Sequence, residues 1–187
     1  MKILGGYLKG KNFYMPKGIR PTQDIMRKSV FDILGQDLTG LSFLDLFSGS
    51  GAMGLEAVSR NARHVEFVEG DIRCSQVISD NLTLLDTKGY AKSGQSYFVS
   101  TADAFLVVKN LARQNKRFDI VFVDPPYGLD LAKKILKQLL AYDIVNPNSI
   151  LIIQHHKLET LPESPGRFLL VRKKKYGDST LSVYKVS

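Results

Sequence analysis

LDLFSGSGAMG, residues 44–54, joins a short apolar run to three closely spaced glycines. Its apolar first half predicts a short strand over residues 42–47, and its second half predicts a turn followed by a helix over residues 52–60. The glycines Gly49, Gly51 and Gly54 have the spacing G-x-G-x-x-G. Glycine at these positions lets a ligand approach the backbone at the amino end of the helix. The stretch therefore predicts a nucleoside-binding turn between a strand and a helix.

Two acidic residues belong to this pattern. Glu69 follows Gly49 by 20 residues, at the end of the next expected strand, where an acid can bind the hydroxyl groups of a ribose. Asp45 comes just before the turn and is expected to point into the same crevice. A carboxylate there repels the pyrophosphate of NAD but attracts the cationic amino group and sulfonium of S-adenosylmethionine. We therefore predict that S-adenosylmethionine is the cofactor and that it is bound by Asp45, Phe47, Ser48, Gly49, Ser50, Gly51, Gly54 and Glu69.

The chain downstream alternates between strands and helices. Apolar runs separated by segments of helical spacing predict right-handed βαβ units and a mostly parallel sheet. The last two strands are separated only by Gly177 and Asp178, so we expect them to form an antiparallel hairpin. The expected strands after the first are 64–69, 96–100, 118–123, 150–155, 168–176 and 179–186, and the expected helices are 71–85, 104–114 and 131–142.

The N-terminal residues have a different pattern. Three glycines interrupt a loose alternation, which predicts a small β-ribbon over residues 3–8 and 11–15. Pro16, Gly18 and Pro21 then break the chain before a helix that Thr22 is placed to cap and that Gly35 ends. We therefore expect a basic N-terminal arm over residues 1–21 and one α/β domain over residues 22–187.

Positive charge is concentrated at the two ends of the chain. The 187 residues include 26 Lys and Arg and 18 Asp and Glu, a formal net charge of +8. Residues 1–28 carry seven positive side chains and one negative, residues 167–187 carry six and one, and the remainder has a net charge of −3. Two basic ends on an acidic body indicate a polyanion-binding protein if the ends meet in space. A surface that only favours solubility is the alternative.

Composition excludes several classes of protein. With 44% hydrophobic and 24% charged residues, the chain is neither disordered nor collagen-like. No apolar run approaches the roughly 20 residues that span a bilayer, and the first residues have no signal-peptide hydrophobic region. Cys74 is the only cysteine, so no internal disulfide can form, and we expect a reducing, cytoplasmic compartment. No Cys/His cluster has the spacing of a metal site, so no metal is expected.

A second motif follows the strand 118–123. Asp124-Pro125-Pro126-Tyr127 comes directly after this strand, and ligands of open α/β sheets bind at the carboxyl ends of strands. The two prolines have fixed φ and no N–H, so they hold neighbouring acceptors rigidly. The Asp124 carboxylate and the Pro125 carbonyl suit the two N–H groups of an exocyclic amine, and Tyr127 offers a flat face on which a base can stack. A rigid strand-exit turn is the alternative interpretation.

This acceptor pair predicts a type of reaction. The lone pair of a nucleobase amine is delocalised into the ring, so the amine is a poor nucleophile. Two acceptors can fix its hydrogens and let the nitrogen pyramidalise toward a methyl donor. The catalytic candidates are therefore Asp124, Pro125, Pro126 and Tyr127. Asp103, at the end of the third strand, can accept from the adenine amine of the cofactor or can cap the helix that follows.

These motifs, taken together, resemble the RsmD family of bacterial ribosomal RNA guanine-N2 methyltransferases. The resemblance covers the chain in order, in ILGG (3–6), RPT (20–22), LDLFSGSG (44–51), LEAVSR (55–60), DIVFVDPPY (119–127) and KYGD (175–178). It implies a Rossmann-like methyltransferase that has a seven-stranded sheet and methylates guanine N2 in 16S ribosomal RNA within an assembling small subunit. It also implies that Arg20 and Thr22 lie near the active crevice. The sequence departs from the family pattern at Ser48, Asn61 and Gln154, where Ala, Gly and Glu are usual.

The target base of a folded RNA must be flipped out of its stack to enter the crevice. Lys and Arg would then hold the nearby phosphates. The predicted RNA-binding residues are Arg20, Thr22, Lys9, Lys11 and Lys17, with Arg172–Lys175 as further candidates. We expect a monomer. An adenine-N6 methyltransferase acting on DNA, an NAD-dependent oxidoreductase and a noncatalytic RNA-binding assembly factor are the alternatives.

Overall fold

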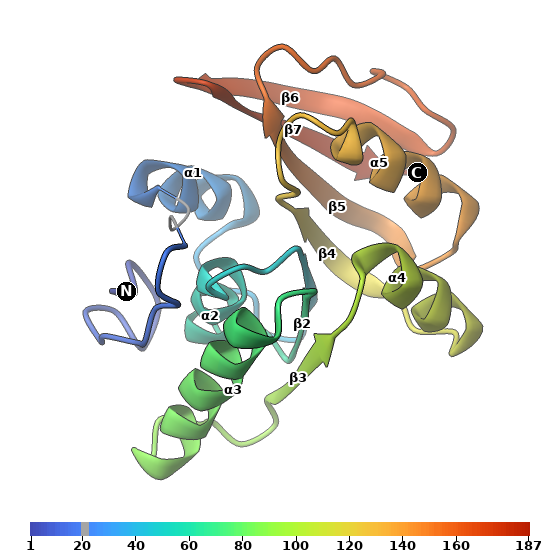
Figure 1. The fold of residues 1–187 in the computed structure, drawn as a ribbon. Helices are drawn as coiled ribbons and strands as arrows, with labels where there is room; N and C mark the ends of the chain where they lie inside the picture. The colour runs from blue at the N-terminus through green and yellow to red at the C-terminus, as the bar shows by residue number, and fades with distance from the viewer. Residues whose placement is uncertain (20–22) are drawn as a thin grey trace.

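Seven strands form a single mixed sheet in the order β3-β2-β1-β4-β5-β7-β6 (Figure 1). The structure is a computed structural model that describes residues 1–19 and 23–187. The strands are β1 (Ser42–Leu46), β2 (His64–Glu69), β3 (Ser96–Thr101), β4 (Phe118–Val123), β5 (Val145–His156), β6 (Phe168–Tyr176) and β7 (Ser179–Val186). The pairs from β3 to β5 are parallel, and β7 runs antiparallel to both β5 and β6. The predicted fold class, with its C-terminal hairpin, is confirmed.

Within the described residues, five helices cover the two faces of this sheet. They are α1 (Asp24–Leu34), α2 (Ala52–Ser59), α3 (Ile72–Thr87), α4 (Ala104–Arg113) and α5 (Leu131–Ala141). Apolar residues of α1, α2 and α3 pack with one set of strand side chains, including Phe43, Phe67 and Phe122. Those of α4 and α5 pack with the opposite set, including Leu44 and Val121. Each central strand is therefore buried on both faces, which explains its nearly continuous apolar sequence.

The strand order places a topological switch between β1 and β4. From β1 the chain proceeds outward to β2 and β3, and it then returns to form β4 on the other side of β1. Leu46 and Val123 are paired at the ends of these two strands, and the Asp124 N–H donates to the Leu46 carbonyl over 3.3 Å. The glycine turn and the Asp124 loop therefore leave the sheet side by side, at the position where open α/β sheets bind ligands.

The N-terminal arm forms a short antiparallel ribbon whose turn packs against α2. The ribbon is shorter than the strands expected over 3–8 and 11–15. Around the bridge between Lys2 and Asn12, the Ile3 N–H donates to the Lys11 carbonyl at 3.0 Å and the Phe13 N–H donates to the Met1 carbonyl at 2.8 Å. The Ser59 carbonyl accepts from the Tyr7 N–H at 2.8 Å, and the Ser59 side chain accepts from the Leu8 N–H at 2.9 Å. Gly6 has a φ of 71°, and a Cβ there would lie 1.8 Å from the Ser59 oxygen, so only glycine permits this approach. The ladder that the alternation predicted is therefore limited to residues 1–3 and 10–13, and residues 7 and 8 bond to α2 instead.

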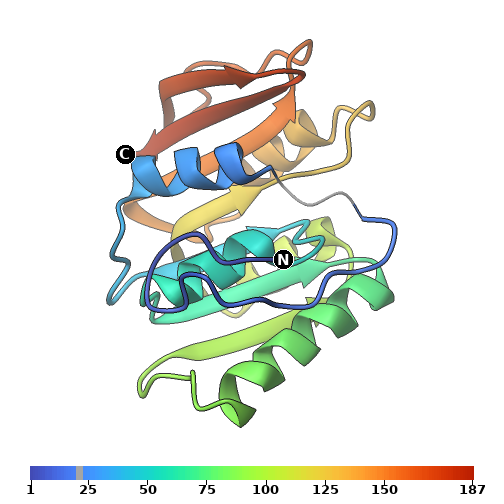
Figure 2. The same cartoon turned by 90° about the vertical axis from the view of Figure 1, so that its left-hand side faces the viewer.

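The arm shares its core with the rest of the chain. Its apolar side chains Ile3, Leu8 and Phe13 are buried in the cluster that α1 and α2 also form, and Figure 2 shows the arm running beside α2. Buried Glu56 links these parts, because it accepts from the Leu4 N–H and pairs with Arg27 and Arg60. The predicted boundary after residue 21 falls within residues 20–22, outside the described part of the chain. Among the described residues, no helix has the length and apolar character needed to cross a bilayer.

Candidate active site

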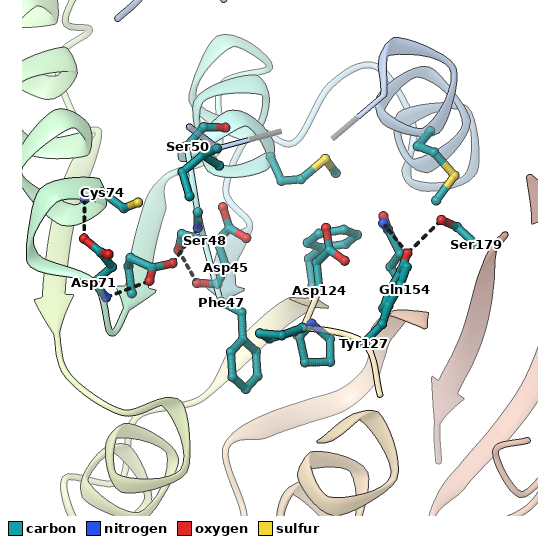
Figure 3. Close-up of a pocket in the computed structure, with 18 of the residues that line it drawn as sticks. Asp45, Phe47, Ser48, Ser50, Asp71, Cys74, Asp124, Tyr127, Gln154 and Ser179 are labelled. Carbon is teal, nitrogen blue, oxygen red and sulfur yellow. Dashed lines mark hydrogen bonds between the residues drawn. The ribbon is translucent and has the colours of Figure 1, made fainter. Parts of the chain in front are cut away.

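A cavity of about 450 Å³ lies at the carboxyl ends of the central strands. This volume is in the range of small-molecule sites in proteins. Its walls come from the glycine turn after β1, the ends of β2, β4 and β5, the start of β7, and both sides of the junction between the arm and α1 (Figure 3). Predicted residues that line it are Asp45, Phe47, Ser48, Gly49, Ser50, Glu69, Asp124, Pro125, Pro126 and Tyr127. The fold therefore brings the two predicted motifs to one cavity.

The glycine turn is shaped by both backbone geometry and packing. Gly49 and Gly51 have φ values of 54° and 73°, which glycine adopts without strain. Gly54 has a different role, because a Cβ on it would lie 2.1 Å from the Phe67 ring of β2. Gly51 and Gly54 do not line the cavity but set the position of α2 against its neighbours. The signature therefore combines a ligand-facing glycine with glycines that allow close helix packing.

Asp45 is a buried carboxylate beneath this turn. Only 1% of its surface is exposed, and one of its oxygens accepts from the Gly54 N–H at 2.9 Å. Burial raises the pKa of Asp45 well above its ordinary value, and the nearby Asp124 and Glu69 carboxylates raise it further. The Gly54 N–H acts in the opposite direction. A cationic group in the cavity would favour the charged form of Asp45.

Glu69 connects the end of β2 to the glycine turn. One of its carboxylate oxygens accepts from the Gly49 N–H at 2.6 Å, and the other accepts from the Asp71 N–H at 2.8 Å. Asp71 then caps α3, and hydrogen bonds from Arg73 lower the pKa of Asp71 to about 2. The cavity thus has three acidic side chains, Asp45, Glu69 and Asp71, on the side of the glycine turn. These negatively charged acceptors fit a ligand that carries positive charge and ribose hydroxyls, and they disfavour a pyrophosphate.

The Asp124-Pro125-Pro126-Tyr127 loop forms the facing wall. Val123, the residue before Asp124, ends β4 beside Leu46 of β1. The Tyr127 hydroxyl lies 2.7 Å from Ser179 Oγ at the start of β7, and it accepts from Gln154 Nε2 at 3.2 Å. The Tyr127 ring also packs edge-on against His156, with 5.6 Å between the ring centroids. These contacts hold the tyrosine ring at the mouth of the cavity, where 42% of its surface is exposed.

Other predicted residues lie elsewhere. Asp103 caps α4 by accepting from the Leu106 N–H at 3.0 Å, and it does not line the cavity. Lys9, Lys11 and Lys17 are on the arm outside the cavity, with Lys11 placed over the Tyr90 ring. The predictions for Arg20 and Thr22 lie outside the described residues.

Sequence reasoning missed several residues of the cavity wall, namely Ile19, Gln23, Met26, Met53, Asp71, Cys74, Phe122 and Ser179. Ser179 could have been found, because an antiparallel β7 must begin beside the carboxyl end of β5. The register confirms this placement, with His156 paired to Ser179. Among the described residues, no cluster of His, Cys, Asp and Glu side chains is arranged to hold a metal ion.

Comparison with known proteins places the chain in a family. The family model described as "Conserved hypothetical protein 95" matches residues 1–185. The chain belongs to this family of RsmD-like methyltransferases. It is 31% identical to the Ribosomal RNA small subunit methyltransferase D of Escherichia coli K12, over 99% of this chain and 89% of that protein. It is also 31% identical to YlbH of Bacillus subtilis, over 99% of this chain and 98% of that one.

A solved structure agrees with this assignment. The structure of yhhF from Escherichia coli superposes with a TM-score of 0.86 and 29% identity, covering 100% of this chain and 98% of the other. The fold is that of the class I methyltransferases. The cavity described above therefore lies where such a fold positions its ligands.

Proposed function

We propose that this protein transfers a methyl group from S-adenosylmethionine to the exocyclic N2 amine of a guanine in small-subunit (16S) ribosomal RNA. The observation that carries the proposal is that the glycine turn with its acids and the Asp124-Pro125-Pro126-Tyr127 loop line the same cavity. The full-length relative from Escherichia coli, named as a small-subunit ribosomal RNA methyltransferase, supports this class of substrate.

The cavity residues divide into two groups by chemistry. Asp45 and Glu69, with the backbone of Gly49, would hold the cofactor. S-adenosylmethionine supplies an electrophilic methyl group when it is bound. Asp124 and the Pro125 carbonyl accept hydrogen bonds from the two N–H groups of the target amine. These bonds turn the nitrogen lone pair out of conjugation with the base ring. Asp124 is also placed to hold the proton that the nitrogen loses once the new N–C bond has formed.

A direct assay tests this function. Small-subunit RNA from a strain lacking the gene is supplied with S-adenosylmethionine, both naked and in assembled subunits, and its nucleosides are then analysed by mass spectrometry. We expect one N2-methylguanosine to appear. Appearance of N6-methyladenosine, or binding of S-adenosylhomocysteine without transfer to any RNA, would overturn the proposal. A thermal shift with NADH but not with S-adenosylhomocysteine would favour an oxidoreductase instead.

The arm is proposed to contact RNA phosphates. Ile19, near the end of the arm, and Ser179, in the basic hairpin, both line the cavity, so both basic ends of the chain border it. Arg172–Lys175 occupy β6, the edge strand of the sheet. Positive charge near the opening comes from Lys17, two residues before Ile19, and from Lys175, which is paired with Thr180 next to Ser179. This placement suits a polyanion. Lys11 lies over the ring of Tyr90, beyond the C-terminal end of α3 and away from the opening.

Replacing Lys9, Lys11 and Lys17 with Gln tests this interaction. We expect weaker RNA binding and a salt dependence whose slope falls by about 0.7–0.9 for each phosphate that the variant no longer neutralises. Affinity for S-adenosylhomocysteine should be unchanged. The matched control replaces Lys133, Lys134 and Lys137, which are exposed on α5 and carry the same total charge. Equal reductions of RNA affinity in the two triple variants would show that the effect is only one of net charge.

A further inference from the structure

Gln154 has a buried hydrogen-bond acceptor without a partner. Its side chain lies on β5, lines the cavity and has 7% of its surface exposed. Nε2 donates to Tyr127, whereas Oε1 has no partner within the described part of the chain. Leaving such an atom unsatisfied is unfavourable, and folded proteins rarely do so without a ligand or water. Of the four buried side-chain atoms that lack a partner there, this is the one whose residue lines the cavity.

Tyr127 and Ser179 set which end of the amide is available. When the Tyr127 hydroxyl directs its proton to Ser179 Oγ, 2.7 Å away, its oxygen is the acceptor for the Gln154 N–H. This chain of two hydrogen bonds, drawn in Figure 3, engages the amide nitrogen and leaves Oε1 for a donor in the cavity. Ser179 and Tyr127 therefore act as positioning residues for Gln154.

The register of the sheet places this acceptor beside Asp124. Val123 and Ile153 are paired in the parallel strands β4 and β5, and they are followed by Asp124, just past the end of β4, and by Gln154, still within β5. Paired positions on neighbouring strands are about 4.8 Å apart and point to the same face. Both residues line the cavity, and in Figure 3 the Gln154 amide is turned toward the Asp124 side. The cavity therefore offers two side-chain acceptors next to each other.

Two adjacent acceptors match the Watson–Crick edge of guanine. That edge presents two neighbouring donors, the N1–H and the N2 amine, whereas adenine presents its N6 amine next to N1, which is an acceptor. We propose that Gln154 Oε1 accepts the N1–H of the target guanine while Asp124 binds its amine, so that Gln154 selects guanine over adenine. The inference rests on the proposed function and assigns the choice of base to one side chain.

Substrates carrying 2-aminopurine test this hydrogen bond. 2-Aminopurine keeps the amine of guanine but has an acceptor in place of the N1–H and lacks the O6 oxygen, so the variants at Gln154 are needed to assign the preference to the N1–H. Once the target position has been mapped, RNA with guanine or 2-aminopurine at that position is compared as substrate. We expect the unaltered protein to prefer guanine by about 10- to 100-fold in kcat/KM. Gln154→Met, of similar shape, should lose most of this preference by slowing transfer to guanine alone. Gln154→Glu, which retains an acceptor, should keep it.

The control is a variant at another buried, unpartnered oxygen. Thr180 lies on β7 outside the cavity, and Thr180→Val should leave the preference intact. Thermal melting and S-adenosylhomocysteine affinity establish that each variant is folded. If Gln154→Met slows transfer to both bases equally, or retains the preference, the proposed hydrogen bond is refuted. If the unaltered protein methylates no guanine in any RNA, the proposed function fails instead. The two results are distinguishable, because the first concerns the Gln154 variant and the second concerns the unaltered protein.

Discussion

Asp124→Ala is expected to lower the rate of methyl transfer by about 100- to 1,000-fold, the usual effect of removing one preorganised electrostatic group from an active site. Asp124 lines the cavity directly after β4, on the wall opposite the glycine turn. Its carboxylate is proposed to fix one amine hydrogen and then to hold the proton released. Alanine provides neither function, whereas asparagine keeps one acceptor oxygen. We therefore expect Asp124→Asn to fall between alanine and the unaltered protein.

The measurement must separate transfer from cofactor binding. Single-turnover methylation of the RNA gives the rate of transfer, and calorimetry with S-adenosylhomocysteine gives the affinity, which we expect to change by less than about threefold. Asp80→Ala provides the control, since Asp80 is an exposed carboxylate on α3 outside the cavity. A near-normal rate in Asp124→Ala would contradict the proposed mechanism.

Asp45→Asn is expected to weaken S-adenosylmethionine binding at least about tenfold, a change of about 1.4 kcal/mol. Asparagine keeps an oxygen that can accept from the Gly54 N–H, so the turn is preserved while the negative charge is lost. The charge is what a cationic ligand in this buried position would require. Affinity in the unaltered protein should rise with pH as Asp45 ionises, and this dependence should largely disappear in the variant. Calorimetry across pH measures both effects.

The same substitution has a stability effect of opposite sign. Because the pKa of Asp45 is raised in the folded state, that state binds the proton more tightly than the unfolded chain does. Ionised Asp45 therefore lowers stability progressively as pH rises from its unfolded pKa toward its folded pKa. Asp45→Asn removes this cost, so its melting temperature relative to the unaltered protein should increase with pH. A difference that is independent of pH would contradict this prediction.

Asp119 provides a control in which the linkage is reversed. Burial alone would raise its pKa, but hydrogen bonds from Ser42 and Asn146 outweigh burial, and the pKa is lowered. Its ionised form therefore stabilises the fold above the unfolded pKa, and this stabilisation is lost as pH falls through the folded pKa. Asp119→Asn should destabilise the protein most at neutral pH, opposite to Asp45→Asn, and should leave S-adenosylmethionine affinity unchanged.

Local chemistry made the two motifs of the cavity predictable. Glycines and prolines restrict the backbone in known ways over a few residues. The glycine turn after one strand and the Asp-Pro-Pro segment after another could therefore be placed from sequence. The hairpin was predictable because two residues are too few for a crossover. The arm was predicted in part, because a ribbon forms around Lys2 and Asn12, whereas Tyr7 and Leu8 bond to Ser59 of α2 and do not extend it.

The class of fold and the two loops that carry the chemistry could be predicted from the amino-acid sequence, because both follow from backbone rules acting over a few residues. Three other features became known only from the folded chain: Gly54 faces Phe67, Asp103 lies outside the cavity, and Gln154 presents a buried acceptor beside Asp124. These outcomes depend on which strands become neighbours and on how far each helix approaches the sheet. Such distances arise from packing between residues far apart in the chain, which no local pattern contains.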